Sequence, residues 1–324
     1  LTASTDTQLP ASFFHLTGLH TLVLADASPL ESPDLVNLTS LTTLHVASSK
    51  LTSQRLLITC CSQLERFLDD FGELLPSLRT LSIYECNYLT RLPESLASLS
   101  LLEMLKSSTC SRFENLPNNL GHLPALRTLI LDELNISNLS DSLCHLRSLK
   151  TFFFIHCTVI QQLPEAFSKL TSLETICILN SMELVLPEGI GELCNLQTLD
   201  VHENLVQPLP PSFTRLTSLT RLELDGCRPE ALLLGIGSLS NLQELLIHHS
   251  PIRTLPESIT ASTSLEILTV DSCWQLSSIP RRLDGFQLLK WLKLTRCKSI
   301  GQYARGRIGD PFYVYWYSTA HGIA

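Results

Sequence analysis

The chain has 324 residues, of which 44% are hydrophobic and only 17% are charged, and its formal net charge is −8. This acidic balance disfavours a nucleic-acid partner, because phosphates require basic surfaces. The sequence contains no uninterrupted apolar run of about 18 residues, so we predict no membrane-spanning segment.

A pattern of apolar residues recurs about every 23 residues along the chain. Its clearest copy is segment 209–227, LPPSFTRLTSLTRLELDGC, which ends on an L-x-L-x-x-C motif. This period and spacing are typical of leucine-rich repeats. The first apolar residue of each predicted strand is Leu22, Leu44, Leu81, Leu105, Leu129, Phe152, Ile176, Leu199, Leu222, Leu245, Leu268 and Leu292.

Each repeat predicts the same two elements. The L-x-L motif predicts a short strand whose alternate side chains point to opposite faces. The following segment, such as Phe213-x-x-Leu216-x-x-Leu219, predicts a helical or 3-10 arc, and proline commonly stands where that arc begins. Stacked repeats then predict an α/β solenoid, a horseshoe with a parallel β-sheet on its concave face and short arcs on its convex face.

The sequence departs from the repeat pattern at three positions. Residues 50–73 lengthen one repeat and predict an irregular insertion that carries a helix; a degenerate repeat on Leu64-x-x-Phe67 is the alternative. Ser107 places a polar residue at an inward strand position. After residue 298 the pattern stops, so we predict a solenoid of about twelve repeats over 1–298 and a C-terminal cap or tail with one last edge strand over 299–324. Because the chain begins at Leu1 within a repeat, we also expect it to be part of a longer protein.

Cysteine recurs at one position of the repeat, three residues after the second apolar strand residue. In a leucine-rich repeat this position points inward, where Asn or Cys satisfies backbone groups of the loop. A column of buried thiols favours a reducing compartment, and we predict a cytoplasmic or nuclear protein. The column comprises Cys86, Cys110, Cys157, Cys227, Cys273 and Cys297.

The repeats resemble those of plant intracellular disease-resistance receptors of the nucleotide-binding, leucine-rich-repeat class. Segments 81–99 (LSIYECNYLTRLPESLASL) and 268–283 (LTVDSCWQLSSIPRRL) follow the form LxxLxLxxCxxLxxLPxxIxxL. The resemblance implies a domain that senses pathogen effectors or a guarded host protein and restrains a nucleotide-binding module. No G-x-x-x-x-G-K-[ST] motif occurs, so that module must lie outside this sequence. Plant Ras-group repeat proteins and some bacterial effectors are also similar.

The strand positions that flank the buried residues predict a recognition surface on the concave face. The residue between the two buried residues of each strand forms a central column across the repeats, and the residue after the second buried one forms an outer column. One part is apolar and contains Ile130, Phe153, Ile155 and Leu179, beside the outer-column residue Tyr84. The other is a charged ladder that comprises Asp200, His202, Glu223, Asp225, His248 and Asp271. Three interpretations of the ladder stay open: a solvated, self-compensating stripe, a surface for a basic partner, and an open zinc site.

The sequence contains no G-x-S-x-G, H-E-x-x-H or phosphate-binding glycine loop. We therefore predict a protein-binding module that is not an enzyme and holds no resident cofactor or metal. Its expected partners are proteins, with no nucleic acid and no membrane. A freestanding scaffold, or the substrate-recognition part of a larger ligase or kinase, is the alternative.

Overall fold

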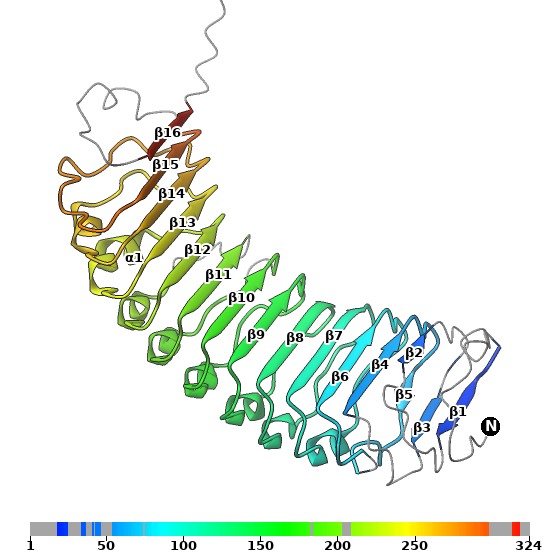
Figure 1. Cartoon of the computed structure of the whole chain (residues 1–324). Helices are drawn as coiled ribbons and strands as arrows, with labels where there is room; N and C mark the ends of the chain where they lie inside the picture. Colours follow the sequence, from blue (N-terminus) through cyan, green and yellow to red (C-terminus); the bar gives the residue numbers. More distant parts are fainter. Residues whose placement is uncertain are drawn as a thin grey trace, which may run out of the picture. The chain divides into compact units, whose positions relative to one another are not determined.

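The computed structural model describes residues 18–24, 34–36, 41, 43–46, 54–73, 75–181, 184–202, 209–297 and 313–317. The chain forms two compact units, Leu1–Leu173 and Glu174–Ala324. Each unit has the architecture of a leucine-rich-repeat solenoid, with parallel strands along one side and short helical segments along the other (Figure 1).

In the first unit, the main sheet is parallel throughout. Its register joins equivalent positions of successive repeats, so that Leu81 of one strand stands beside Leu105 of the next. The strands, in spatial order, are β2 (Asp34–Val36), β4 (Arg55–Thr59), β6 (Thr80–Tyr84), β7 (Met104–Cys110), β8 (Thr128–Leu134) and β9 (Thr151–Ile155).

A smaller parallel sheet in the first unit changes the assignment of the first two predicted strands. β1 (Thr21–Leu24) pairs with β3 (Thr43–Val46), and Leu44 of β3 pairs with Phe67 of β5 (Arg66–Phe67). The strands predicted at Leu22 and Leu44 therefore exist, but they are not in the sheet that contains Leu81.

The prediction of a helix-bearing insertion at 50–73 is wrong within the described part of that segment, 54–73. It contains β4, which pairs with β6 along its whole length, from Arg55 beside Thr80 to Thr59 beside Tyr84. Leu56 and Ile58 are buried, and Cys61 follows at the inward cysteine position. The segment is thus a repeat, as the alternative proposed, but its main strand is centred on Leu57 and Phe67 lies in β5 instead.

The second unit repeats the same strand geometry. β10 (Thr175–Leu179), β11 (Thr198–His202), β12 (Arg221–Asp225), β13 (Glu244–His248), β14 (Ile267–Asp271) and β15 (Trp291–Thr295) form consecutive parallel pairs. β16 (Tyr313–Tyr317) pairs with β15 in parallel, so a strand is present in the segment after residue 298.

The predicted arcs are 3-10 helices in most repeats. Apolar residues every third position suit a 3-10 helix, in which i and i+3 lie on one side. Proline is the N-cap of five of them, where its missing N–H leaves no hydrogen bond unmade. The segments are η2 (Glu94–Ser98), η3 (Leu120–His122), η4 (Asp141–His145), η5 (Glu165–Lys169), η6 (Glu188–Glu192), η7 (Pro211–Arg215), α1 (Glu230–Gly235), η8 (Ile236–Ser238) and η9 (Glu257–Ala261).

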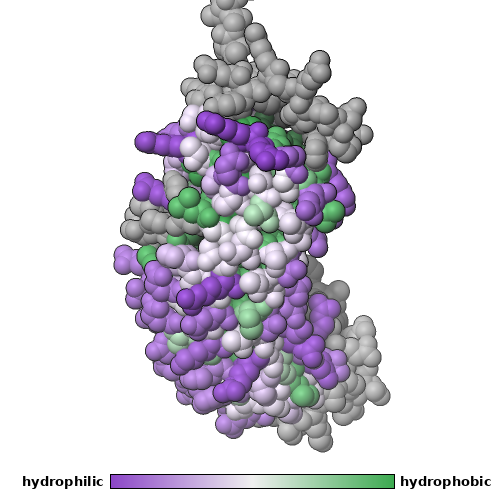
Figure 2. Space-filling model, turned by 90° about the vertical axis from the view of Figure 1, so that its left-hand side faces the viewer, coloured by the Kyte–Doolittle hydropathy of each residue, from purple (hydrophilic) through white to green (hydrophobic). Residues whose placement is uncertain are grey.

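Apolar side chains fill the space between strands and 3-10 segments. In β9, for example, Phe152 and Phe154 are fully buried while Phe153 is half-buried on the opposite face. Ser107 is buried at the inward position predicted for it, beside Ile83 and Leu131 in the register. On the face shown in Figure 2, hydrophilic and weakly polar residues cover most of the surface and apolar ones form small separate groups. No helix in the described ranges is long and apolar enough to cross a membrane.

The predicted cysteine column is confirmed. Cys86, Cys110, Cys157, Cys227 and Cys273 are fully buried, and Cys297 is half-buried. Each thiol donates to the carbonyl oxygen two residues earlier, for example Cys157 Sγ to Ile155 O at 3.3 Å. Ser181 and Ser250 make the same contact where the repeat has serine.

These thiols lead to a prediction about alkaline pH. Burial raises the pKa of Cys157, Cys227 and Cys273 to about 12, from an ordinary value of 9.0. The neutral thiols therefore stabilise the fold fully below pH 9, and that stabilisation is lost as the pH rises towards 12. We expect the free energy of unfolding in urea to fall above pH 9 by up to about 1.4 kcal/mol per pH unit for each thiol.

The matched control replaces these three cysteines by serine, which does not titrate and already occupies the same position in Ser181 and Ser250. We expect the decline above pH 9 to be shallower in the triple variant. An equally steep decline in both proteins would contradict the assignment of the alkaline sensitivity to this column.

Candidate recognition surface

The predicted recognition residues lie on the sheet face that the core does not cover. All eleven are half-buried and alternate along their strands with fully buried residues. In the first unit they are Tyr84 on β6, Ile130 on β8, and Phe153 and Ile155 on β9. In the second unit they are Leu179 on β10, Asp200 and His202 on β11, Glu223 and Asp225 on β12, His248 on β13, and Asp271 on β14.

In the first unit, apolar and basic side chains are adjacent on this face. Ile130 stands beside Phe153 in the register, and Lys106 stands beside Ile130. The Lys106 ammonium lies 4.7 Å from the centre of the Tyr84 ring, a cation–π contact. The structure thus brings Ile130 and Phe153 together, whereas Leu179 belongs to the other unit and stands beside His202 there.

In the second unit, the ladder has the predicted register but different side-chain partners. His202, Asp225, His248 and Asp271 stand beside one another in that order. The imidazoles instead meet Glu223: its Oε1 lies 3.4 Å from His202 Nε2 and 3.9 Å from His248 Nε2. Glu223 is therefore the centre of the ladder.

Arg221 is a central residue of this surface that sequence reasoning missed. Its guanidinium forms ion pairs with Glu223 (2.5 Å), with Glu244 on the next strand, and with Asp200 at 3.7 Å. Burial raises the pKa of Asp200, an effect that the nearby Arg221 only partly offsets. Arg221 and Glu244 occupy the first position of their strands, whereas the predicted surface residues occupy the third and fifth positions. The opposite charges at this first position were the sequence signal that could have predicted the pair.

The two remaining carboxylates of the ladder are held by neighbouring polar groups. Asp225 Oδ1 lies 2.8 Å from His249 Nδ1, and Thr295 donates its hydroxyl to Asp271 Oδ1. Burial acts to raise the pKa of Asp271, but the bond from Thr295 and nearby positive charge outweigh it and lower the pKa. Asp271 is therefore held in its ionised form.

We call five carboxylates of this face the acidic network: Asp200, Glu223, Asp225, Glu244 and Asp271. Arg221 forms ion pairs with Asp200, Glu223 and Glu244, and the three histidines that contact the network are His202, His248 and His249. Such a surface attracts cationic groups of a partner and orients them. The zinc interpretation of the ladder gains no support, because its side chains do not bring three metal-ligand atoms within 4.8 Å of one another in the described residues.

Comparison with known proteins supports both the fold and the resemblance. No family model matches the chain. It is 26% identical over 210 residues to TMV resistance protein N of Nicotiana glutinosa, which covers 56% of the chain and 17% of that protein. It is also 26% identical over 151 residues to disease resistance-like protein DSC1 of Arabidopsis thaliana, covering 38% of the chain and 12% of that protein. The matches thus span less than a fifth of these relatives.

Solved structures share the fold at lower identity. A leucine-rich-repeat protein of Leptospira interrogans superposes with a TM-score of 0.57 at 21% identity, covering 89% of this chain and 87% of that one. Toll, in the Toll–Spatzle complex of Drosophila, superposes with a TM-score of 0.59 at 16% identity, covering 90% and 46%. The chain therefore has a leucine-rich-repeat fold, and its sequence resembles plant disease-resistance proteins of the nucleotide-binding, leucine-rich-repeat class.

Proposed function

We propose that the chain is a protein-recognition module that binds its partner on the exposed sheet face. The observation that carries this proposal is the acidic network, in which five carboxylates share one face of four consecutive strands and Arg221 forms ion pairs with three of them. A solvated stripe requires no shared arginine, whereas a preorganised network lowers the cost of ordering side chains when a partner binds.

Within that role, the module senses pathogen effectors or a guarded host protein in an intracellular plant immune receptor and restrains that receptor's nucleotide-binding module. The support is the resemblance to resistance proteins in Nicotiana glutinosa and Arabidopsis thaliana. The Toll–Spatzle complex provides a precedent for a protein partner on this fold. Eleven free cysteines, most of them buried, favour a reducing compartment.

The test compares two double variants that remove equal charge from the second unit. Glu223→Gln with Asp225→Asn neutralises the acidic network, whereas Glu188→Gln with Glu192→Gln neutralises two exposed carboxylates on η6, away from the sheet face. We expect a protein captured from plant cytosol to be recovered at least tenfold less by the first variant, a loss of about 1.4 kcal/mol, and equally by the second.

Circular dichroism and urea unfolding establish that both variants are folded. Recovery by the wild type should also fall as salt increases, because exposed charge pairs are screened. Equal recovery by both variants, or an equal loss in both, would contradict recognition through the acidic network.

A further inference from the structure

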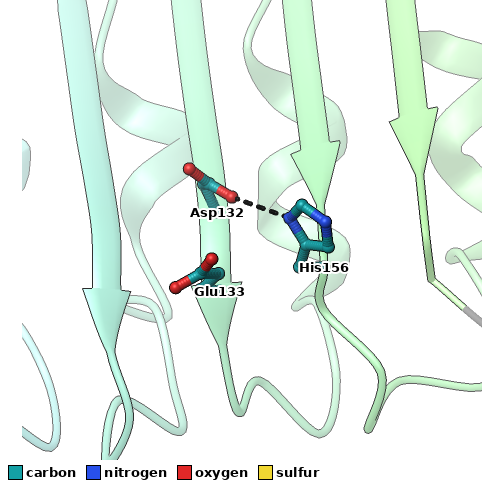
Figure 3. Close-up of side chains that lie close together, drawn as sticks. All are labelled: Asp132, Glu133 and His156. Atoms are coloured by element: carbon teal, nitrogen blue, oxygen red, sulfur yellow. Dashed lines mark hydrogen bonds and ion pairs between the residues drawn. The ribbon is translucent and has the colours of Figure 1, made fainter.

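Three potential metal ligands converge at one end of the sheet in the first unit. Asp132 and Glu133 lie on β8, and His156 follows the end of β9 (Figure 3). One ligand atom from each lies within 4.8 Å of the others, and no other such group occurs in the described ranges. This cluster is separate from the acidic network and belongs entirely to the first unit.

Backbone geometry brings these three side chains to the same place. The residue after the outer strand position adopts a left-handed conformation in successive repeats, with φ of 51° at both Glu133 and His156. Asp132 stands beside Ile155 in the register, so His156 is one residue further along the neighbouring strand. The left-handed turn directs the imidazole back towards the Asp132 carboxylate, as Figure 3 shows.

A second Asp–His pair in the chain provides an internal comparison. Asp225 and His249 occupy the same repeat positions in the second unit, but Gly226 replaces the acidic residue there. Their Nδ1–Oδ1 distance is 2.8 Å, an ordinary hydrogen bond. The corresponding distance from His156 to Asp132 is 3.4 Å, which is long for a hydrogen bond. A separation of about 3.4 Å is also compatible with two ligands that each lie about 2.1 Å from a tetrahedral ion.

A hydrogen bond from a serine on the neighbouring strand also holds the Asp132 carboxylate in position. Buried Ser108 donates its hydroxyl to Asp132 Oδ2 at 2.8 Å, and the other oxygen, Oδ1, faces His156. Hydrogen bonds of this kind orient metal-binding carboxylates. Asp132 Oδ2 is thus fixed by Ser108, and Oδ1 is directed towards His156.

We propose that Asp132, Glu133 and His156 bind one divalent transition-metal ion. Two carboxylates and an imidazole suit Zn²⁺, Co²⁺ or Mn²⁺ better than the all-oxygen ions Ca²⁺ and Mg²⁺. Three protein ligands at an exposed position leave a fourth coordination position for water or for a side chain of another molecule.

The test titrates chelator-treated protein with Zn²⁺ by calorimetry at pH 7.5. Every protein carries Cys194→Ser, because this exposed thiol would itself bind zinc. We expect one equivalent to bind, with affinity at least about tenfold lower in His156→Asn and in Glu133→Gln. His249→Asn, in the pair that has Gly226, should leave the affinity unchanged. Co²⁺ spectra without a thiolate charge-transfer band would show that the buried cysteines do not contribute.

The proposal is overturned if the protein that retains both His156 and His249 does not bind one equivalent of Zn²⁺. An equal loss in His156→Asn and His249→Asn would overturn it as well, because scattered surface histidines would then account for the binding. A thiolate band in the Co²⁺ spectrum that persists in His156→Asn would assign the ion to cysteine instead.

Discussion

Replacing Phe152 with alanine is expected to lower the free energy of unfolding by about 3–5 kcal/mol. Phe152 is fully buried in β9 and lies at the centre of an aromatic group. Its ring is stacked with that of Phe154 at 5.9 Å and meets Phe167 of η5 edge-on at 5.3 Å. Removing the ring therefore leaves a cavity between the sheet and the 3-10 segment, where both backbones are fixed by the neighbouring repeats.

Phe153→Ala is the matched control, since it removes the same side chain from the next residue of the same strand. Phe153 is half-buried on the opposite face of the sheet, so we expect its loss to cost about 1 kcal/mol or less. Urea unfolding followed by circular dichroism measures both. Similar losses in the two variants would show that the two faces of β9 are packed alike, contrary to the burial pattern.

The regular repeat period made most of this fold predictable. From Leu81 to Leu292 each predicted strand is present, because an L-x-L motif that recurs with a stacking partner has one way to bury its leucines. β4 was missed even though Leu56-x-Ile58 followed by Cys61 has the same spacing as Leu81-x-Ile83 followed by Cys86. Its leucine falls only about twelve residues after Leu44, which breaks the period when counting starts from that residue.

The strands at Leu22 and Leu44 show a second limit of periodicity. In each repeat, backbone segments lie on both sides of the core. The apolar residues of both segments recur with the period of the repeat. Spacing alone therefore does not say which sheet a strand joins. Pairing with Phe67 instead of Leu81 depends on contacts between repeats, which are visible only in three dimensions.

On the exposed sheet face, too, the positions of residues were predictable but their contacts were not. The columns were predictable, because alternate strand residues point to one face. The partners within them were not: Glu223 meets two histidines, and Asp132 and Asp225 each meet a histidine that lies outside both columns. These contacts depend on side-chain reach and on left-handed backbone at His156 and His249, and a column model contains neither.

Gly121→Ala is expected to destabilise the protein by about 3 kcal/mol or more, at the upper end of the usual cost of overpacking. Gly121 is buried in η3, and an added Cβ would overlap the backbone carbonyl oxygen of Ser142 in the next 3-10 segment. A carbonyl oxygen cannot rotate away as a side chain does, so the two repeats would have to separate locally. Gly72 and Gly191 face Ser95 and Ser212 in the same way.

The glycines provide their own graded series for this prediction. A Cβ on Gly237 would approach Ser258 O at 2.9 Å, a much smaller overlap, and one on Gly18 would meet nothing within 4 Å. We expect the loss of unfolding free energy to be largest for Gly121→Ala, smaller for Gly237→Ala and within about 0.5 kcal/mol of zero for Gly18→Ala. Urea titrations of the three variants measure this order. A cost for Gly121→Ala no greater than that for Gly237→Ala would mean that adjacent repeats yield readily at η3, and that close backbone packing there does not set the stability of the stack.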